Sequence, residues 1–358
     1  MPLTAARPSL LQVLRLHALL AGLVAAYLAI SYTISSWHQV PVAGDAAADI
    51  FMGFLIDVPM MIFFVLLWRL LRLTYVQRDP NRFATLAAEV RGFVTDRSRI
   101  WGGLVAVVLM TGMMIAFGQM KNLIPVLNPY SWDEAFMHLD KMLHFGVHPY
   151  QIAHAVFGSH YAITFFTGLY NIWMFLMFFV LFGACFTLPD NPVRMQFLIA
   201  FLLTWAIGGN LLATIFSSAG PVYFAQLGLG DTYAGLMQRL QDHASTGSLT
   251  VINIQNLLWD MHTGPKQLNG ISAFPSMHVA SSVLMAIFLG RLSPLLGRFA
   301  WVFAVGIMIG SVLLAWHYAV DGYAGALIAL ASWYAAGWLV RLTKGHRLQQ
   351  VSRTAPQA

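Results

Sequence analysis

The sequence predicts an all-α, polytopic membrane helical bundle with about eight transmembrane helices. Of its 358 residues, 58% are hydrophobic and only 9% are charged, whereas soluble domains carry about 25% charged residues. No water-soluble shape buries that much apolar surface, so lipid must cover much of it. The apolar residues also group into runs of roughly 20, the length that a helix needs to cross a hydrocarbon layer of about 30 Å.

The apolar runs allow six to eight spans, and we predict eight. We place them at about 14–34, 51–73, 100–118, 161–187, 195–217, 274–292, 298–316 and 319–341. The run over 298–341 is too long for one span, and His317 marks its midpoint. No small-residue cleavage site follows the first run, so we expect a retained span rather than a signal peptide.

The distribution of basic residues predicts the orientation. With both termini inside, sixteen of the twenty Lys and Arg residues fall in cytoplasmic segments, and the outer segments keep only Lys121, Lys141, Arg239 and Lys266. Because cytoplasmic loops are enriched in Lys and Arg, we expect a protein of the cell inner (plasma) membrane with cytoplasmic N- and C-termini. The basic residues form no patch interleaved with aromatic residues, so we expect no nucleic-acid partner.

Two outer segments are too long to be simple turns. In the first, about 128–160, Ser131 and Glu134 match a capping box. An apolar stripe then recurs at helical spacing: Trp132, Phe136, Leu139 and Leu143. We interpret this segment as an amphipathic helix in the outer interface of the membrane. The second, about 218–273, has glycine-rich turns and a polar stretch, which predicts a partly structured outer cap.

These features divide the chain into three parts. Residues 1–99 hold two N-terminal spans and a basic cytoplasmic loop, and residues 100–342 hold six further spans with both outer segments. Residues 343–358 are polar, and we expect them to form a disordered cytoplasmic tail.

Two short clusters bring titratable groups to the ends of spans, where such groups are rare unless they function or pair. FPSMH ends at His278 and starts the sixth span, and HYAVDG begins at His317 and joins the seventh to the eighth. The free N–H groups of a helix start form an anion site. Because the sixth span runs inward and the seventh returns outward, both histidines reach the same extracytoplasmic (periplasmic) face.

His317 and Asp321 lie four residues apart, on one face of a helix. The carboxylate can then fix the tautomer of the imidazole and leave the other nitrogen basic. Two histidines, an orienting carboxylate and an anion site are what phosphoryl transfer through a phosphohistidine requires. A structural pairing of these residues or a metal site is the alternative, but we predict neither metal nor cofactor.

FPSMH followed about forty residues later by HYAVDG resembles the second and third signature motifs of the type 2 phosphatidic acid phosphatase superfamily. The match is nearest to the inositol phosphorylceramide synthase-like branch, which GPVYF (Gly220 to Phe224) also resembles. The resemblance implies a six-helix catalytic core, here the third to eighth spans. It implies His317 as nucleophile, Asp321 as its orienting partner and His278 as general acid. Ser276 would hydrogen-bond a phosphate oxygen.

The chain departs from the family pattern where that pattern places positive charge. The third motif usually has an arginine six residues before its histidine, and this position is Ser311. The first motif contains a lysine and an Arg-Pro pair, and neither cation accompanies Pro221 of GPVYF. Since phosphoryl transfer depends on positive groups, we expect Lys266 or Arg239 in the outer cap to substitute.

Two further residues are candidates for substrate binding. They are Tyr223 of GPVYF and Asn171 of the fourth span. An interhelical hydrogen bond is the alternative role for Asn171, as it is for Asn210 of the fifth span.

Together these patterns predict a membrane phosphotransferase that moves a phospho-head group from a lipid phosphoester donor to a lipid hydroxyl acceptor. The resemblance suggests an inositol-containing donor and a ceramide or diacylglycerol-like acceptor. The alternative is a lipid phosphate or prenyl diphosphate phosphatase that uses the same triad with water. A transporter or non-catalytic lipid-binding protein is a third hypothesis, which the lack of internal repeats disfavours.

Overall fold

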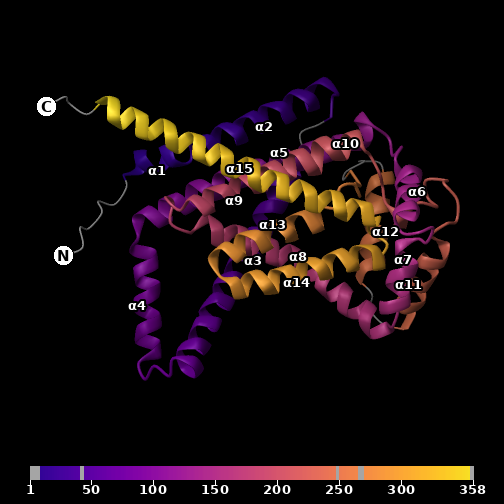
Figure 1. Ribbon diagram of the computed structural model, residues 1–358, viewed down its shortest axis with the longest axis horizontal. Helices are drawn as coiled ribbons and strands as arrows, with labels where there is room; N and C mark the ends of the chain where they lie inside the picture. Colours follow the sequence, from indigo (N-terminus) through magenta and orange to yellow (C-terminus); the bar gives the residue numbers. More distant parts are fainter. Residues whose placement is uncertain (1–8, 41–43, 247–249, 265–269, 355–358) are drawn as a thin grey trace.

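The computed structural model describes residues 9–40, 44–246, 250–264 and 270–354, and in these residues it contains helices and loops but no β-strand. Figure 1 shows an elongated bundle with both termini at one end and a group of short helices at the other. Within the described residues, seven helices are long and apolar enough to cross a membrane. A shorter apolar helix, α13 (Met277–Leu292), has 16 residues. The fold is therefore the predicted polytopic helical bundle.

The N-terminal helices are α1 (Leu10–Leu16), α2 (Ala18–Trp37), α3 (Gly44–Leu71) with a π-helical extension (Arg72–Val76), and α4 (Arg82–Thr95). The first predicted span is thus divided at His17, which separates α1 from α2. α2 packs along α5 (Arg97–Leu127). α4 has no buried residue and runs across the direction of the bundle (Figure 1).

The central bundle is completed by α5, α8 (His160–Cys185), α9 (Pro192–Leu203) with a π-helix (Thr204–Leu212) and α10 (Ala213–Ile215), α13, α14 (Pro294–Leu313) and α15 (Ala319–Thr354). Short polar residues cap several starts: Asp96, Ser159 and Asn191 accept hydrogen bonds from the first turns of α5, α8 and α9. Gly290 and Gly297 let α13 and α14 approach closely, because a Cβ on Gly297 would lie 2.5 Å from the Cα of Gly290. This tight hairpin returns the chain to the end from which α13 starts.

α5 and α15 continue well past the C-terminal ends of the predicted spans. α5 continues past residue 118, so Lys121, expected in an outer segment, lies on the helix. α15 continues to Thr354, whereas the sequence predicted a disordered tail from residue 343. The physical reason is that residues 343–354 contain Lys, Arg, Leu and Gln, which favour helix, with no proline before Pro356. The last four residues of the predicted tail lie outside the described part of the chain.

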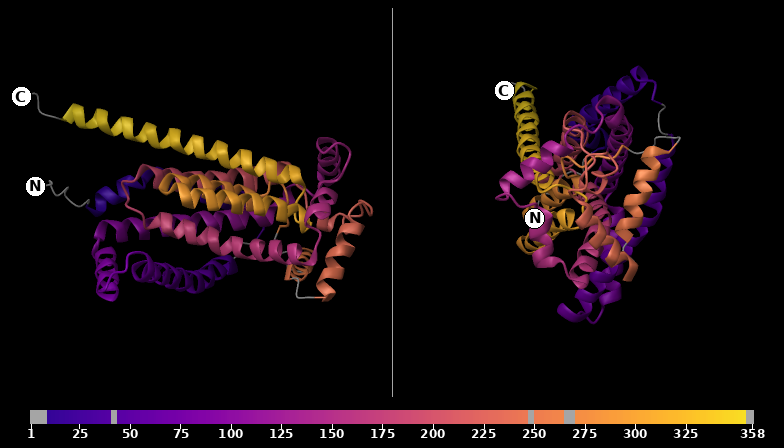
Figure 2. Two further views of the ribbon diagram at one scale, coloured as in Figure 1. Left: turned by 60° about the horizontal axis from the view of Figure 1, so that its bottom comes forward. Right: turned by 90° about the vertical axis from the view of Figure 1, so that its right-hand side faces the viewer.

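Both predicted outer segments contain helices, and these lie at the end opposite the termini (Figures 1 and 2). They are α6 (Asp133–Leu143), α7 (Pro149–Phe157), a 3-10 turn (Pro221–Tyr223), α11 (Ala234–Thr246) and α12 (Thr250–Thr263). We call this set the outer cap. It covers the end of the bundle at which α13 and α15 begin.

α6 differs from the predicted interfacial helix in two respects. The capping box is wrong: Trp132 is the N-cap residue and no side chain caps the helix, because the Ser131 hydroxyl donates to Asn128 instead (3.4 Å). The helix also packs on the bundle through Asp133 and Asp140, which are buried, while Leu143 of the apolar stripe is 51% exposed. Carboxylates therefore help to attach this helix to the protein.

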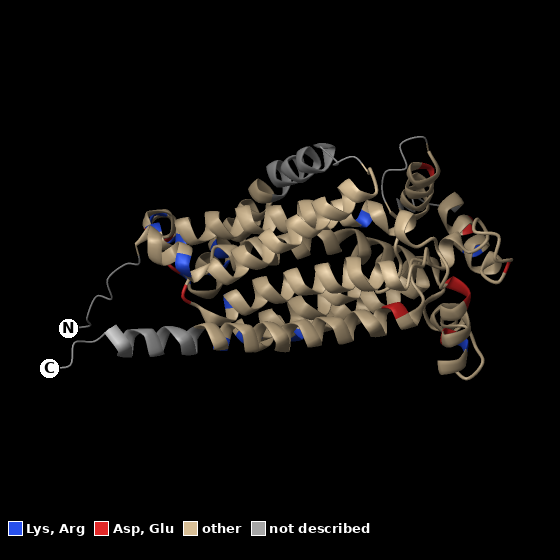
Figure 3. Ribbon diagram, turned by 90° about the horizontal axis from the view of Figure 1, so that it is seen from above, with Lys and Arg blue, Asp and Glu red and all other residues tan. Residues whose placement is uncertain are grey.

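Charged residues are distributed unevenly along the bundle. Figure 3 shows Lys and Arg gathered at the end that holds the termini, and Asp and Glu mostly at the capped end.

Arg194, at the basic end, is fully buried: its guanidinium donates to the carbonyls of Gly102 (2.9 Å) and Cys185 (2.8 Å) and contacts His17 Nε2 (3.0 Å). This arginine ties the start of α2 to α5, α8 and α9.

Candidate active site

His278 lies in the first turn of α13, against aromatic rings of α8. The hydroxyl of Ser276 caps the helix by accepting a hydrogen bond from its first turn (3.4 Å). The N–H of Ser276 donates to the carbonyl of Asp321 (2.9 Å), which ties this helix start to α15. The centroid of the His278 ring lies 4.3 Å from that of Tyr170 and 4.0 Å from that of Trp173. These contacts hold the imidazole at the helix N-terminus.

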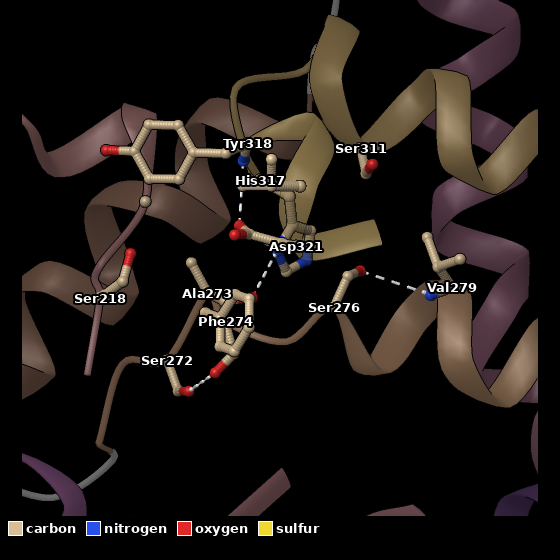
Figure 4. Close-up of polar contacts among 12 residues, drawn as sticks. Ser218, Ser272, Ala273, Phe274, Ser276, Val279, Ser311, His317, Tyr318 and Asp321 are labelled. Atoms are coloured by element: carbon tan, nitrogen blue, oxygen red, sulfur yellow. Dashed lines mark hydrogen bonds and ion pairs between the residues drawn. The ribbon is translucent and has the colours of Figure 1, made fainter. Parts of the chain in front are cut away.

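His317 lies in the turn between α14 and α15 (Figure 4). α14 ends in a Schellman motif: the N–H of Trp316 donates to the carbonyl of Ser311, and Ala315 adopts the left-handed conformation with φ 62°. The chain thus turns back, and Nδ1 of His317 donates a hydrogen bond to the carbonyl of Ala273 (2.8 Å). Because a carbonyl only accepts, Nδ1 carries the proton and Nε2 keeps its lone pair.

Asp321 acts mainly on the backbone of this turn. Its Oδ2 accepts a hydrogen bond from the N–H of Tyr318 (2.9 Å) and lies 3.4 Å from Nδ1 of His317. An acid at the third helical position commonly reaches back to the helix start in this way. His317 precedes α15, so the turn, rather than a shared helical face, brings the two residues together. Nδ1 of His317 therefore lies closer to the Ala273 carbonyl than to the Asp321 carboxylate.

The two imidazoles converge at the capped end of the bundle. The ring centroids of His278 and His317 are 5.6 Å apart, and the ring planes are inclined by 65°. Reacting atoms in a near-attack arrangement lie about 3–3.5 Å apart, so one phosphorus atom between the rings is within reach of both. The arrangement suits attack by one ring and proton donation by the other.

A protein-family model described as the PAP2 superfamily matches residues 134–335, more than half of the chain. The chain belongs to the PAP2 superfamily. The family predicted from the motifs is therefore confirmed at this level, and membership supports a phosphatase or phosphotransferase of lipid phosphoesters. No curated protein and no solved structure matches the chain. His278, His317 and Asp321 all lie within the PAP2 match, whereas α5 precedes it.

A buried carboxylate on α6, which the motifs did not indicate, supports the PAP2 site. Asp133 accepts hydrogen bonds from the Ser218 hydroxyl (2.8 Å) and from the N–H of Ala219 (2.9 Å). It also accepts from the N–H of Gly220 (2.8 Å) and from the hydroxyl of Tyr318 (3.0 Å). Asp133 therefore joins the chain before GPVYF to the turn that carries His317.

A second carboxylate of α6 binds the start of α15. Asp140 accepts hydrogen bonds from the N–H groups of Ala319 (2.8 Å) and Val320 (2.9 Å). Burial raises the pKa of the Asp140 carboxyl above its usual value, and these two hydrogen bonds only partly offset that effect. The sequence signal was the seven-residue spacing of Asp133 and Asp140, which places both on one helical face. Among the described residues, no group of three or more His, Cys, Asp and Glu could hold a metal ion.

The GPVYF segment packs against the His317 turn. Gly220 has φ 97°, and a Cβ there would lie 2.8 Å from the carbonyl oxygen of Trp316, so the close approach requires glycine. Tyr223, a predicted substrate-binding residue, is buried, and its hydroxyl donates to the carbonyl of Gln255 (2.9 Å). Its hydroxyl thus contacts α12 and not the histidines.

The other predicted site residues lie apart from the histidines or outside the described residues. Asn171 is exposed on α8, and Arg239 is exposed on α11, where it interacts electrostatically with His154. Lys266 lies outside the described residues. Ser311 is buried, and its hydroxyl donates to the last turns of α14 (2.8 Å). Arg239 and Ser311 therefore supply no positive charge beside the histidines.

The outer cap closes the site. His317, Asp140, Tyr318, Tyr150 and Tyr233 are among the residues that line a cavity of about 10 Å³, which has room for about one water molecule. Only 6% of His317 is exposed. The pKa of His317 is lowered to about 4, mainly by burial. The hydrogen bond to Ala273 acts in the opposite direction, and the charge of Lys121 acts in the same direction as burial. At neutral pH the imidazole is therefore uncharged, as a nucleophile must be.

Proposed function

We propose that this protein is a membrane phosphotransferase that moves a phospho-head group between lipids through a phosphohistidine on His317. The observation that carries the proposal is the 5.6 Å separation of the His278 and His317 rings. The hydrogen bond from Nδ1 of His317 to Ala273 leaves Nε2 as a neutral nucleophile beside the second imidazole.

The reaction has two steps. In the first, Nε2 of His317 bonds to phosphorus while the bond from phosphorus to the departing lipid oxygen breaks. His278, which takes up a proton when the anionic substrate is bound, gives this proton to that oxygen. In the second, the acceptor hydroxyl oxygen bonds to phosphorus, the phosphorus–nitrogen bond breaks, and the hydroxyl proton passes to His278. Asp321 holds the turn of the nucleophile. The Ser276 hydroxyl, whose oxygen caps α13, donates its own proton to a phosphoryl oxygen.

Burial of the site favours transfer to a lipid hydroxyl over hydrolysis. The outer cap leaves His317 only 6% exposed, and exclusion of water suppresses hydrolysis of a reactive intermediate. The second candidate is a phosphatase of lipid phosphates or prenyl diphosphates that uses the same residues with water. Membership of the PAP2 superfamily supports this candidate equally well.

The substrates and the sidedness belong to the same proposal. The likeness of GPVYF and FPSMH to the inositol phosphorylceramide synthase-like branch favours an inositol-containing donor and a ceramide or diacylglycerol-like acceptor. Lys and Arg gather at the end that holds the termini (Figure 3), and loops rich in Lys and Arg face the cytoplasm. The site at the opposite end then faces the extracytoplasmic side of the inner (plasma) membrane.

The test uses purified protein and a phospholipid donor labelled in its phosphate, with and without a ceramide or diacylglycerol acceptor. We expect label to move to the acceptor and, after rapid denaturation, to remain on the protein as an acid-labile, base-stable adduct. His317→Ala abolishes both signals, and His278→Ala spares donors with good leaving groups. Acceptor-independent release of water-soluble phosphate identifies the phosphatase. Wild-type turnover by His317→Ala contradicts both candidates.

A further inference from the structure

The side chains of α6 and α15 that flank the histidines are carboxyl groups, although the proposed substrate is an anion. Asp133, Asp140 and Asp321 are each 2% exposed or less. Their hydrogen-bond donors are neutral N–H and hydroxyl groups. Ser311 stands where a cation was expected. Because the transition state of phosphoryl transfer spreads negative charge over the phosphoryl oxygens, the site requires a positive group from another element.

Lys121 of α5 is a cation whose charge reaches this site. Its charge acts on His278 and on His317. The backbone of Lys121 lies against the segment that leads to the site: a Cβ on Gly270 would lie 2.0 Å from the carbonyl oxygen of Lys121. Three residues further along, Ala273 accepts the Nδ1 proton of His317. The segment that leads from Gly270 into α13 therefore connects α5 directly to the site.

No ion pair within the described residues includes Lys121. In the described part of the chain, the ion pairs join Arg69 to Glu89, Arg99 to Asp96 and His317 to Asp321. A cation on an apolar helix without a counter-ion is costly and is a functional-site hypothesis by default.

Two buried hydrogen-bond donors point to an anionic ligand; one is on the ring that stacks on His278, and the other is on the residue before His317. The hydroxyl of Tyr170 and Nε1 of Trp316 are buried and have no acceptor among the described residues. Their rings are parallel to within 3° with centroids 6.2 Å apart, and Tyr170, only 6% exposed, stacks on His278. Buried donors in native proteins are nearly always hydrogen-bonded. An anion between them and the histidines satisfies both.

We propose that Lys121, the Tyr170 hydroxyl and the Trp316 ring N–H form the subsite that binds the phosphoryl oxygens of a phosphate mono- or diester. This inference rests on the proposed function. Lys121 supplies the charge that Ser311 lacks, and it does so from outside the matched residues 134–335. In apolar surroundings an ammonium group is weakly screened, so one lysine has a large effect on charge that develops in the transition state.

The first test measures turnover of the labelled phospholipid by Lys121→Met, with Lys141→Met, an exposed lysine of α6, as matched control. We expect Lys121→Met to lower kcat/KM by about 100-fold, the effect of removing one group that stabilises transition-state charge, and Lys121→Arg to lose less. Lys141→Met keeps the wild-type value. Lys121→Met melts at the wild-type temperature or above, because it removes an unpaired cation from an apolar helix, and this result separates a loss of charge from misfolding.

The second test measures binding apart from turnover, by calorimetric titration of the purified protein with tungstate, a tetrahedral phosphate analogue. We expect affinity to fall about tenfold or more in Lys121→Met and Tyr170→Phe, and to persist in inactive His317→Ala. If the wild type turns over no lipid phosphoester but tungstate affinity depends on Lys121, the subsite stands and the proposed function fails. If His317→Ala is inactive while Lys121→Met keeps wild-type turnover and tungstate affinity, the subsite is overturned and the proposed function stands.

Discussion

At the scale of single residues, a main-chain carbonyl determines which nitrogen of His317 is protonated. The carbonyl of Ala273 accepts the Nδ1 proton at 2.8 Å, whereas Oδ2 of Asp321 is 3.4 Å away and binds the N–H of Tyr318. A carbonyl keeps the same role at every pH, while a carboxylate changes its role when it is protonated. The nitrogen proposed as nucleophile is therefore defined independently of the charge on Asp321.

The lowered pKa of His317 predicts an unusual acid limit for turnover. An ordinary histidine has a pKa of about 6.5, and burial lowers that of His317 to about 4. Since only the neutral imidazole of His317 attacks phosphorus, the acid-side decline of kcat/KM should lie near its pKa of about 4 and not near 6.5. The measurement is kcat/KM against pH, with circular dichroism to confirm folding at each point. A half-maximal value near pH 6.5 on the acid side would contradict a buried, neutral nucleophile.

At the scale of elements, α6 fixes two segments of the site at once. Asp133 binds the chain before GPVYF, and Asp140 binds the first N–H groups of α15. Those N–H groups have no partner within their own helix, so α6 caps α15 from a distant part of the chain. α6, which the sequence predicted as an interfacial helix, therefore positions the turn of His317.

Removing one of these carboxylates should destabilise the protein. Asp133→Ala leaves two buried N–H groups and two hydroxyls without their acceptor, and each unsatisfied group costs about 1–3 kcal/mol. We expect a loss of about 3 kcal/mol or more in the free energy of unfolding, measured by thermal or denaturant unfolding in detergent, and a matching loss of activity. The control is Glu134→Ala, an exposed acid at the next position. Equal stability of the two variants would show that Asp133 is not a structural anchor.

At the scale of the whole molecule, the basic end and the capped end are opposite (Figure 3). The native cysteine, Cys185, is buried and contributes little background to thiol labelling. In an otherwise native chain, Lys141→Cys at the capped end should react with a membrane-impermeant maleimide on intact cells. Arg91→Cys on α4 should react only after lysis. The reverse pattern would place the histidines on the cytoplasmic side.

The spans and the two motifs, which depend on local sequence, were predictable, whereas the features that depend on distant contacts were not. Long apolar runs indicated the spans, and the two motifs with an in-and-out helix pair brought His278 and His317 to one end. Asp133 and Asp140 were missed because their partners lie up to 185 residues away in the chain. Lys121 was assigned to an outer segment because the apolar run ends before the helix does. Polarity marks the end of a span but does not mark the end of a helix.

The two carboxylates of α6 reach their partners largely through peptide N–H groups, which every residue except proline possesses. Side chains at Ala219, Ala319 and Val320 can therefore be exchanged without losing the hydrogen bonds that position these segments. The walls of the site are free to change in shape during evolution while the reacting nitrogens keep their separation. A scaffold anchored in this way allows new lipid preferences to arise without a redesign of the chemistry.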